Sequence, residues 1–212
     1  MTKAFLFDFD GTLADTAPGI VLTMKGTFRQ LGLKVPEDES IRQTIGLPLA
    51  DSIRLLGNLP DEEVEVGVQT YRRLFPTFEL THIKMFPSVA ETILELRRRG
   101  IRLAICTSRG RNSLESILSR YGLWDCFEAV VTASDKFPSK PAPDMVLSLL
   151  ERMGLEPDDV FVVGDTTFDV MMGSSARCRT IAVTYGNHSL EQLSSAHPTH
   201  MIDCFPEILD LI

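Results

Sequence analysis

The 212-residue sequence lacks the cysteine and histidine patterns that are typical of zinc sites and disulfide frameworks. Its four cysteines are scattered and include no Cys-x-x-Cys pair. Among its four histidines, His197 and His200 lie close together, but Pro198 between them breaks helical spacing and favours a surface loop over a metal site. These absences argue against a zinc protein and indicate a reducing compartment.

Excess positive charge and long hydrophobic runs are also missing. The 21 Lys and Arg residues are outnumbered by 29 Asp and Glu residues, and the formal net charge is -8. Because nucleic acids and anionic membranes bind cationic surfaces, we expect neither as a partner. No apolar run approaches a membrane span, and the stretch before Asp8 is too short for a signal peptide. We expect a soluble cytoplasmic protein, either a monomer or a homodimer.

Short apolar runs alternate with segments of helical periodicity along most of the chain. The runs predict strands at 4–7, 103–106, 129–132, 160–163 and 180–183. Segments bounded by Pro or Gly predict helices at 89–98, 113–121 and 143–153. This alternation is typical of a doubly wound α/β fold with a parallel sheet.

The long interval between the first two predicted strands contains no pattern typical of a core strand. Helical spacing there predicts helices at 20–31, 50–56 and 61–75. We therefore predict an α/β core of residues 1–15 and 83–212, and an inserted all-helical domain, the cap, of residues 16–82. Because the cap follows the first strand, it is placed to cover a site at the end of that strand.

The segment Asp8-Phe9-Asp10-Gly11-Thr12 follows the first apolar run. Residues two apart in a strand point to the same side, so Asp8 and Asp10 should share one site, and Gly11 allows the backbone to turn. A structural alternative is an acidic loop that caps a helix through Thr12.

Polar residues also follow the other predicted strands, and the carboxyl ends of strands form the ligand crevice in open α/β sheets. They are Thr107, Ser108, Asp165 and Asp169. Lys140 lies before a predicted helix, beside prolines that stiffen the chain, and a lysine on its own is usually only solvated. Thr107 and Ser108 could bind phosphate oxygens, although helix capping explains them equally well. The second acidic pair is more telling, because Asp169 lies one helical turn after Asp165 on the same side.

Carboxylates gathered in one crevice would repel one another, at roughly 1 to 4 kcal/mol for each pair about 4 Å apart. A divalent cation offsets this repulsion, and oxygen ligands favour Mg²⁺ over zinc or copper. Protonation of one carboxylate also relieves it and creates a general acid. The pattern therefore predicts a Mg²⁺ site with a neighbouring proton donor.

Taken in order, these motifs resemble the haloacid dehalogenase superfamily of phosphohydrolases, and specifically its phosphoglycolate phosphatase-like group with a helical cap. The resemblance spans almost the whole chain. It implies Mg²⁺-dependent hydrolysis of a small phosphorylated metabolite, with phosphoglycolate as the first guess. By this resemblance, Asp8 is the nucleophile that forms an aspartyl phosphate, and Asp10 is the general acid and base. The ion would be held by Asp8, the backbone carbonyl of Asp10, and Asp165, with Asp169 supporting the ion or Lys140.

The resemblance further implies that Thr107, Ser108 and Lys140 bind the phosphoryl group. Many phosphoglycolate phosphatases carry Asn at the position of Ser108, so the substrate stays open. The alternatives are a phosphomutase resembling β-phosphoglucomutase, which usually has a Glu-Asp pair where this chain has Gly164-Asp165, and a pyrophosphatase or nucleotidase with the same machinery. A receiver-like phospho-aspartate signalling module is the non-enzyme alternative, but it has no cap.

Overall fold

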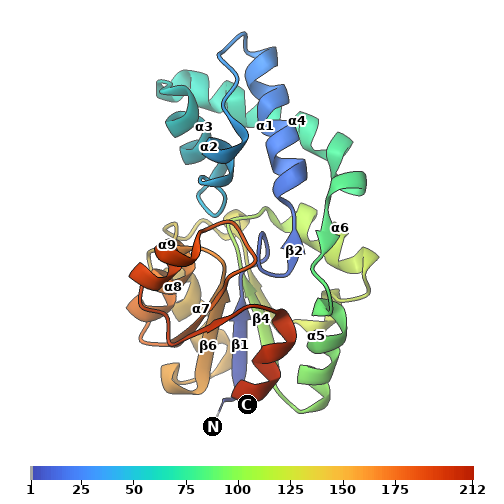
Figure 1. Ribbon diagram of the computed structural model, residues 1–212, viewed down its shortest axis with the longest axis vertical. Helices are drawn as coiled ribbons and strands as arrows, with labels where there is room; N and C mark the ends of the chain where they lie inside the picture. The colour runs from blue at the N-terminus through green and yellow to red at the C-terminus, as the bar shows by residue number, and fades with distance from the viewer. Residues whose placement is uncertain (1) are drawn as a thin grey trace.

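A six-stranded, wholly parallel sheet forms the centre of the protein, with the strand order β5-β4-β1-β6-β7-β8. The computed structural model describes residues 2–212, apart from the side chains of residues 79–81. The strands are β1 (Ala4–Phe7), β4 (Arg102–Cys106), β5 (Ala129–Val131), β6 (Val160–Gly164), β7 (Arg179–Val183) and β8 (His200–Ile202). The expected parallel α/β fold is confirmed, and both chain ends lie at the far end of the sheet from the cap (Figure 1).

Helices cover both faces of this sheet. They are α5 (Val89–Arg98), α6 (Arg111–Arg120), α7 (Asp144–Met153), α8 (Thr167–Ser175) and α9 (Leu190–Ser195), with 3₁₀ turns η1 (Trp124–Cys126), η2 (Ala133–Asp135), η3 (Pro157–Asp159) and η4 (Phe205–Leu211). Successive side chains of β1 point to opposite faces of the sheet, because side chains alternate along a strand. Phe5 and Phe7 pack in the cluster that includes α5 and α6, whereas Ala4 and Leu6 pack in the cluster that includes α7.

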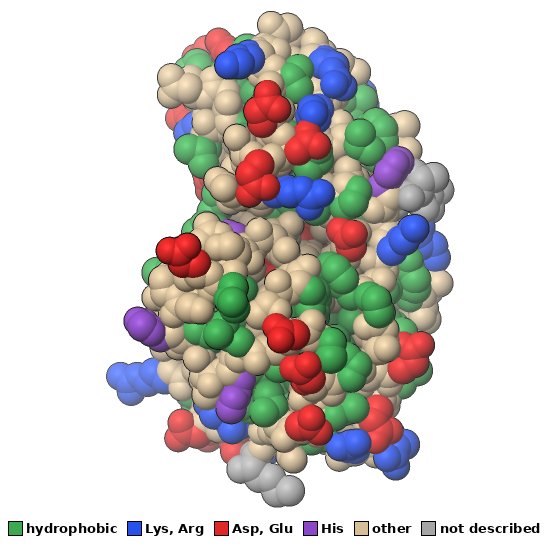
Figure 2. Space-filling view, viewed as in Figure 1, with side chains coloured by type: hydrophobic (Ala, Val, Ile, Leu, Met, Phe, Trp, Pro, Cys, Tyr) green, Lys and Arg blue, Asp and Glu red, His purple; other side chains and the backbone are tan. Residues whose placement is uncertain are grey.

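The inserted segment is helical and lies at the carboxyl end of the sheet (Figure 1). Its helices are α1 (Ala17–Gln30), α2 (Asp38–Arg42), α3 (Leu49–Gly57) and α4 (Asp61–His82). Two short antiparallel strands, β2 (Ala14–Asp15) and β3 (Lys84–Met85), join it to the core. Figure 2 shows the surface hollowed on the left, where the two parts meet. The domain boundaries at 15/16 and 82/83 remain our proposal.

The predicted core strands agree with β1, β4, β5, β6 and β7 to within one residue at each end. The expected end of a helix at Phe75 is wrong, because α4 continues through Pro76 to His82. A proline removes one backbone hydrogen bond without always ending a helix. The surface loop expected around His197 and His200 is correct for His197, but His200 begins β8.

The sequence patterns also missed several short elements, among them β2, β3, β8, α2 and α9. Strand β8 was missed because two of its three residues are exposed, so it has no apolar run. Helix α2 was missed because its five residues bury only Ile41. No described helix is long and apolar enough to cross a membrane.

Candidate active site

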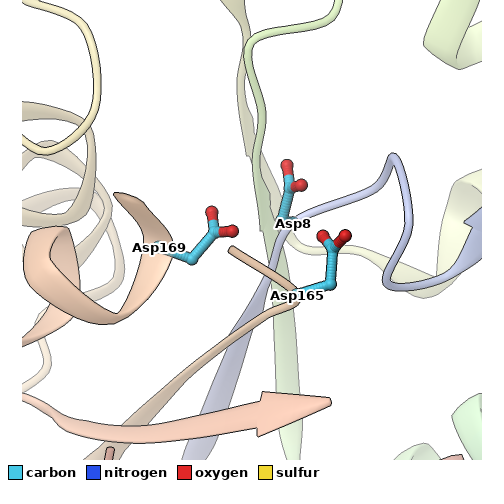
Figure 3. A group of neighbouring side chains, drawn as sticks. All are labelled: Asp8, Asp165 and Asp169. Carbon is cyan, nitrogen blue, oxygen red and sulfur yellow. The ribbon is translucent and has the colours of Figure 1, made fainter. Parts of the chain in front are cut away.

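Three carboxylates meet at the carboxyl end of the sheet. Asp8 follows β1, Asp165 follows β6, and Asp169 lies on the first turn of α8 (Figure 3). One oxygen from each lies within 4.8 Å of the others, and the three residues are at most 3% exposed. The parallel register of β1 and β6 places their ends side by side, which explains why residues 157 positions apart in sequence (165 − 8) meet here.

Lys140 joins two of these carboxylates. Its Nζ lies 2.8 Å from Asp8 Oδ1 and 2.6 Å from Asp169 Oδ1. Burial acts to lower the pKa of Lys140, but the coulombic attraction of Asp169 and Asp8 outweighs it and holds that pKa above its usual value. Lys140 is therefore a charged ammonium group inside the site.

Asp8 is only partly neutralised by this lysine. Its Oδ2 is buried and has no hydrogen-bond partner within the described part of the chain. Burial raises the pKa of Asp8 from 3.8 to about 7, with further increases from Asp169 and Asp10 and an opposing effect from Lys140. An oxygen that is buried without a partner is costly, so Oδ2 is placed to bind something outside the chain.

Asp165 is fixed by donors that leave its carboxylate in place beside Asp8. Its Oδ1 accepts a hydrogen bond from Thr12 Oγ1 at 3.1 Å. Its Oδ2 accepts hydrogen bonds of 2.8 Å from both the backbone N–H and the Nδ2 of Asn187. Burial and the nearby carboxylates nevertheless raise the pKa of Asp165 well above its usual range.

Two glycines make the approach to Asp165 possible. A Cβ atom on Gly11 or on Gly186 would overlap the Asp165 side chain, and Gly11 also has a φ of +84°. Only glycine adopts that φ without strain while leaving room for the carboxylate.

Asp169 is oriented by the start of its own helix. Its Oδ2 accepts hydrogen bonds from Thr166 Oγ1 at 2.6 Å and from the Thr166 backbone N–H at 3.1 Å, and the Thr166 side chain in turn caps α8. This reciprocal capping box holds Oδ1 toward Lys140. Asp169 therefore contacts the lysine, and its expected supporting role remains a proposal.

The carboxylate of Asp10 is not part of the three-acid cluster. It is paired with Arg109, whose Nη2 lies 2.5 Å from Asp10 Oδ1 and whose Nε lies 3.1 Å from each carboxylate oxygen. We expected four carboxylates to converge, but only three of the described carboxylates form the cluster. The charge of the fourth, Asp10, is compensated by Arg109.

Thr107 and Ser108 follow β4 and reach the same end of the sheet. Thr107 is 1% exposed, and its Oγ1 accepts a hydrogen bond of 3.2 Å from the backbone N–H of Arg109. Ser108 Oγ instead donates to the backbone carbonyl of Gly46 in the cap, at 2.9 Å. Ser108 therefore contacts the cap, and its predicted role in binding substrate remains a proposal.

Sequence reasoning missed several residues that complete this site. They are Thr12, Arg109, Thr166 and Asn187. Thr12 lies in the acidic motif itself, but sequence reasoning assigned it a role only in the structural alternative, as a helix cap. Arg109 could have been suspected, because a cation that directly follows the hydroxyls after a core strand lies at the ligand edge of the sheet. Asn187 carried no local signal.

The three-acid cluster fits a hard divalent cation. Its donors are carboxylate oxygens, and one of them, Asp8 Oδ2, has no partner among the described residues. The raised pKa values of Asp8 and Asp165 reflect burial and mutual repulsion, which a cation would offset. The residues present can therefore hold a metal ion.

Comparison with known proteins agrees with this geometry. The family model for haloacid dehalogenase-like hydrolases matches residues 5–183. The chain belongs to the haloacid dehalogenase-like hydrolase family. The "Probable phosphatase IndB" of Dickeya dadantii is 36% identical over 99% of this chain and 93% of that protein. A crystal structure of a predicted phosphatase from Clostridium acetobutylicum, 26% identical, superimposes with a TM-score of 0.91 and covers 100% of this chain and 98% of that one.

Other relatives of this haloacid dehalogenase-like hydrolase carry more specific names. A phosphoglycolate phosphatase of Vibrio vulnificus is 28% identical over 99% of this chain and 96% of that protein. The pyrophosphatase PpaX of Oceanobacillus iheyensis is 27% identical over 99% of this chain and 96% of that protein. The protein is a phosphatase, and its relatives include enzymes named for two different substrates.

Proposed function

We propose that this phosphatase hydrolyses a small phosphomonoester with Mg²⁺, through an aspartyl phosphate on Asp8. The observation that carries the proposal is the state of the Asp8 carboxylate. One oxygen is held by Lys140, and the other, Oδ2, is buried and unpartnered among the described residues. Such an oxygen is preorganised to attack an electrophile or to bind a cation.

In the first step, an Asp8 oxygen bonds to phosphorus while the bond from phosphorus to the leaving-group oxygen breaks. Asp10, which must carry a proton at the start of this step while it stays hydrogen-bonded to Arg109, gives that proton to the leaving-group oxygen, so an alcohol departs. Lys140 contacts the nucleophile, and Thr107 is buried directly after β4; both would balance the charge on the phosphoryl oxygens. In the second step, water attacks the aspartyl phosphate, Asp10 takes the proton from the water, and phosphate leaves with Asp8 restored.

Asp8, Asp165 and the backbone carbonyl of Asp10 would hold the Mg²⁺ ion. The ion supplies charge stabilisation to a phosphoryl oxygen and screens the substrate from the nucleophile. Thr12 and Asn187 keep the Asp165 carboxylate aimed at the cluster. Asp169 acts indirectly, because it holds Lys140.

A small substrate suits the space beside this site. A pocket of about 150 Å³ is lined by Gly11, Asp15, Ala17, Arg42, Phe86, Tyr185, Gly186 and Asn187. One of these residues, Asn187, donates a hydrogen bond to Asp165. Pockets for drug-sized ligands are typically about 300 to 1,000 Å³. Arg42 of cap helix α2 is the cation in this lining and would favour a leaving group that carries a carboxylate, as in phosphoglycolate. Inorganic pyrophosphate is the second candidate, because relatives of similar identity are named for it.

A phosphomutase with an acidic pair at the end of β6 fits this chain poorly. Gly164 stands where that pair would have its Glu, and a Cβ atom at Gly164 would overlap the side chain of Asp169. Replacing the glycine would therefore displace the residue that positions Lys140. This supports hydrolysis over phosphoryl transfer between sugars.

The test is a panel of phosphorylated metabolites with Mg²⁺, including phosphoglycolate, pyrophosphate, and glucose 1-phosphate with a bisphosphate activator. The wild type should release phosphate from a small monoester, and Asp8→Asn should release none. Asp158→Asn, an exposed carboxylate at the opposite end of β6, is the matched control and should keep full activity. Full activity in Asp8→Asn would overturn the covalent mechanism, and product isomerisation without phosphate release would favour the mutase.

A further inference from the structure

Arg109 stands at the meeting point of the acidic motif and the cap. Its guanidinium group pairs with Asp10 through Nε and Nη2, while its Nη1 donates to Ser113 Oγ at 2.6 Å. Arg109 and Asp10 are 8% and 9% exposed. A buried ion pair contributes little net stability because desolvation offsets the attraction, so its geometry is the more informative property.

Two aromatic rings lie against this guanidinium group. The Arg109 Cζ atom lies 5.5 Å from the ring centre of Phe9 in the acidic motif and 5.1 Å from that of Phe75 in cap helix α4. Phe75 is in turn stacked on Tyr71, one helical turn earlier, with ring centres 5.7 Å apart. An arginine that lies against two rings and contacts a carboxylate through two nitrogens has few rotamers available. It therefore restricts the position of that carboxylate.

We propose that Arg109, held by Phe75 of the cap, is a positioning residue that places the Asp10 carboxyl group beside the leaving-group oxygen. The inference rests on the proposed function, in which Asp10 exchanges the proton. The same contact ties the position of Asp10 to the cap, because Phe75 belongs to α4 and the Asp10 loop belongs to the core. Asp10 is thereby in its working position when the cap covers the site.

The test compares two substrates that differ in their need for a proton. The p-nitrophenolate ion leaves phosphorus without protonation, whereas the alkoxide from glycerol phosphate needs a proton. We would measure kcat/KM, which covers the steps up to departure of the leaving group, for the wild type and for Arg109→Leu. Loss of positioning should lower kcat/KM for glycerol phosphate by about 10²-fold and for p-nitrophenyl phosphate by less than about 5-fold. KM should change little for either substrate.

Matched variants separate positioning from a general structural role. Arg109→Lys keeps the positive charge but loses the two-nitrogen contact of the guanidinium group, and it should retain part of the glycerol phosphate activity that Arg109→Leu loses. Phe75→Leu should show the same selective loss of glycerol phosphate activity in milder form. Both keep a cation beside Asp10, so they test the inference even if Arg109→Leu does not fold. Arg111→Leu removes a cation whose Nη2 contacts the Val130 carbonyl and should match the wild type.

A double-mutant cycle checks that Arg109 acts through Asp10. In an Asp10→Asn background, Arg109→Leu should cost less than about 2-fold further on glycerol phosphate, because the group that it places is already gone. The inference would be overturned if the losses of kcat/KM in the two single variants multiplied in the double variant. It would also be overturned if Arg109→Leu lost kcat/KM equally on both substrates with a raised KM. Either result would indicate that Arg109 binds the phosphoryl group. Absence of any Mg²⁺-dependent turnover by the wild type would instead overturn the proposed function.

Discussion

Ser108 Oγ donates a hydrogen bond of 2.9 Å to the backbone carbonyl of Gly46, across the boundary between core and cap. Gly46 has a φ of +99°, and a Cβ atom there would lie 3.3 Å from Thr166 Cγ2. The cap loop that carries Gly46 therefore lies directly over the start of α8. In the structure, Ser108 joins the cap to the catalytic end of the sheet.

Removal of this hydroxyl should loosen the cap without affecting the nucleophile. We expect Ser108→Ala to raise KM by roughly 2- to 10-fold with a smaller change in kcat, because one hydrogen bond contributes about 0.5 to 1.5 kcal/mol. Steady-state kinetics on the preferred substrate would check this. Ser119→Ala, on an exposed face of α6, is the control. A large fall in kcat would show that Ser108 contacts the reacting phosphoryl group instead.

The glycines that contact Asp165 should not tolerate substitution by alanine, because the added methyl group would displace the Asp165 carboxylate. Gly186→Ala would place its Cβ atom against Asp165, so we expect a large loss of activity and weaker metal binding. Gly110→Ala is the matched control, because no atom lies within 4 Å of a Cβ atom there. Activity and Mg²⁺ titrations of the two variants would test this, and normal metal binding by Gly186→Ala would contradict the crowding.

Magnesium should stabilise the fold as well as support activity. An ion that binds the folded state alone adds about 2.7 kcal/mol at a concentration 100-fold above its Kd. For a chain of this size, that corresponds to a rise in Tm of roughly 5 to 10 °C. Thermal unfolding in EDTA and after addition of MgCl₂ would measure it. Asp165→Asn should lose the rise and Asp158→Asn should keep it, whereas an unchanged rise in Asp165→Asn would exclude Asp165 as a ligand.

The raised pKa of Asp8 predicts the direction in which the stability of the metal-free protein changes with pH. Burial holds this pKa at about 7, above the ordinary value of 3.8, so the folded state binds the proton more tightly than the unfolded chain. The contribution of this proton to the free energy of unfolding is fully present below about pH 4 and is lost as the pH rises through 7. Relative to the wild type, Asp8→Asn should therefore gain stability between about pH 4 and 8, by up to about 4 kcal/mol.

Denaturant unfolding in EDTA at several pH values would measure this difference in the free energy of unfolding. Added Mg²⁺ should reduce it, because the ion offsets the charge on Asp8. A difference that stays constant with pH would contradict the raised pKa.

The amino-acid sequence by itself determined the strands of the sheet and most of the acidic site. Apolar runs such as Ala4–Phe7 are buried on both faces in a parallel sheet, so each strand can be recognised from a few consecutive residues of the sequence. Parallel strands end at a common edge, and Asp8, Asp165 and Asp169 could therefore be expected to lie together before any contact was known. Lys140 was expected there only through the family resemblance.

Only the tertiary structure decided which partner each carboxylate has. Asp10 pairs with Arg109 and not with the three-acid cluster, Asp165 is held by Thr12 and Asn187, and Ser108 contacts the cap. These contacts join residues that are far apart in sequence and depend on side-chain direction and local space. No periodicity records such pairings, because period 2 and period 3.6 report which face a residue occupies and not which distant group meets it.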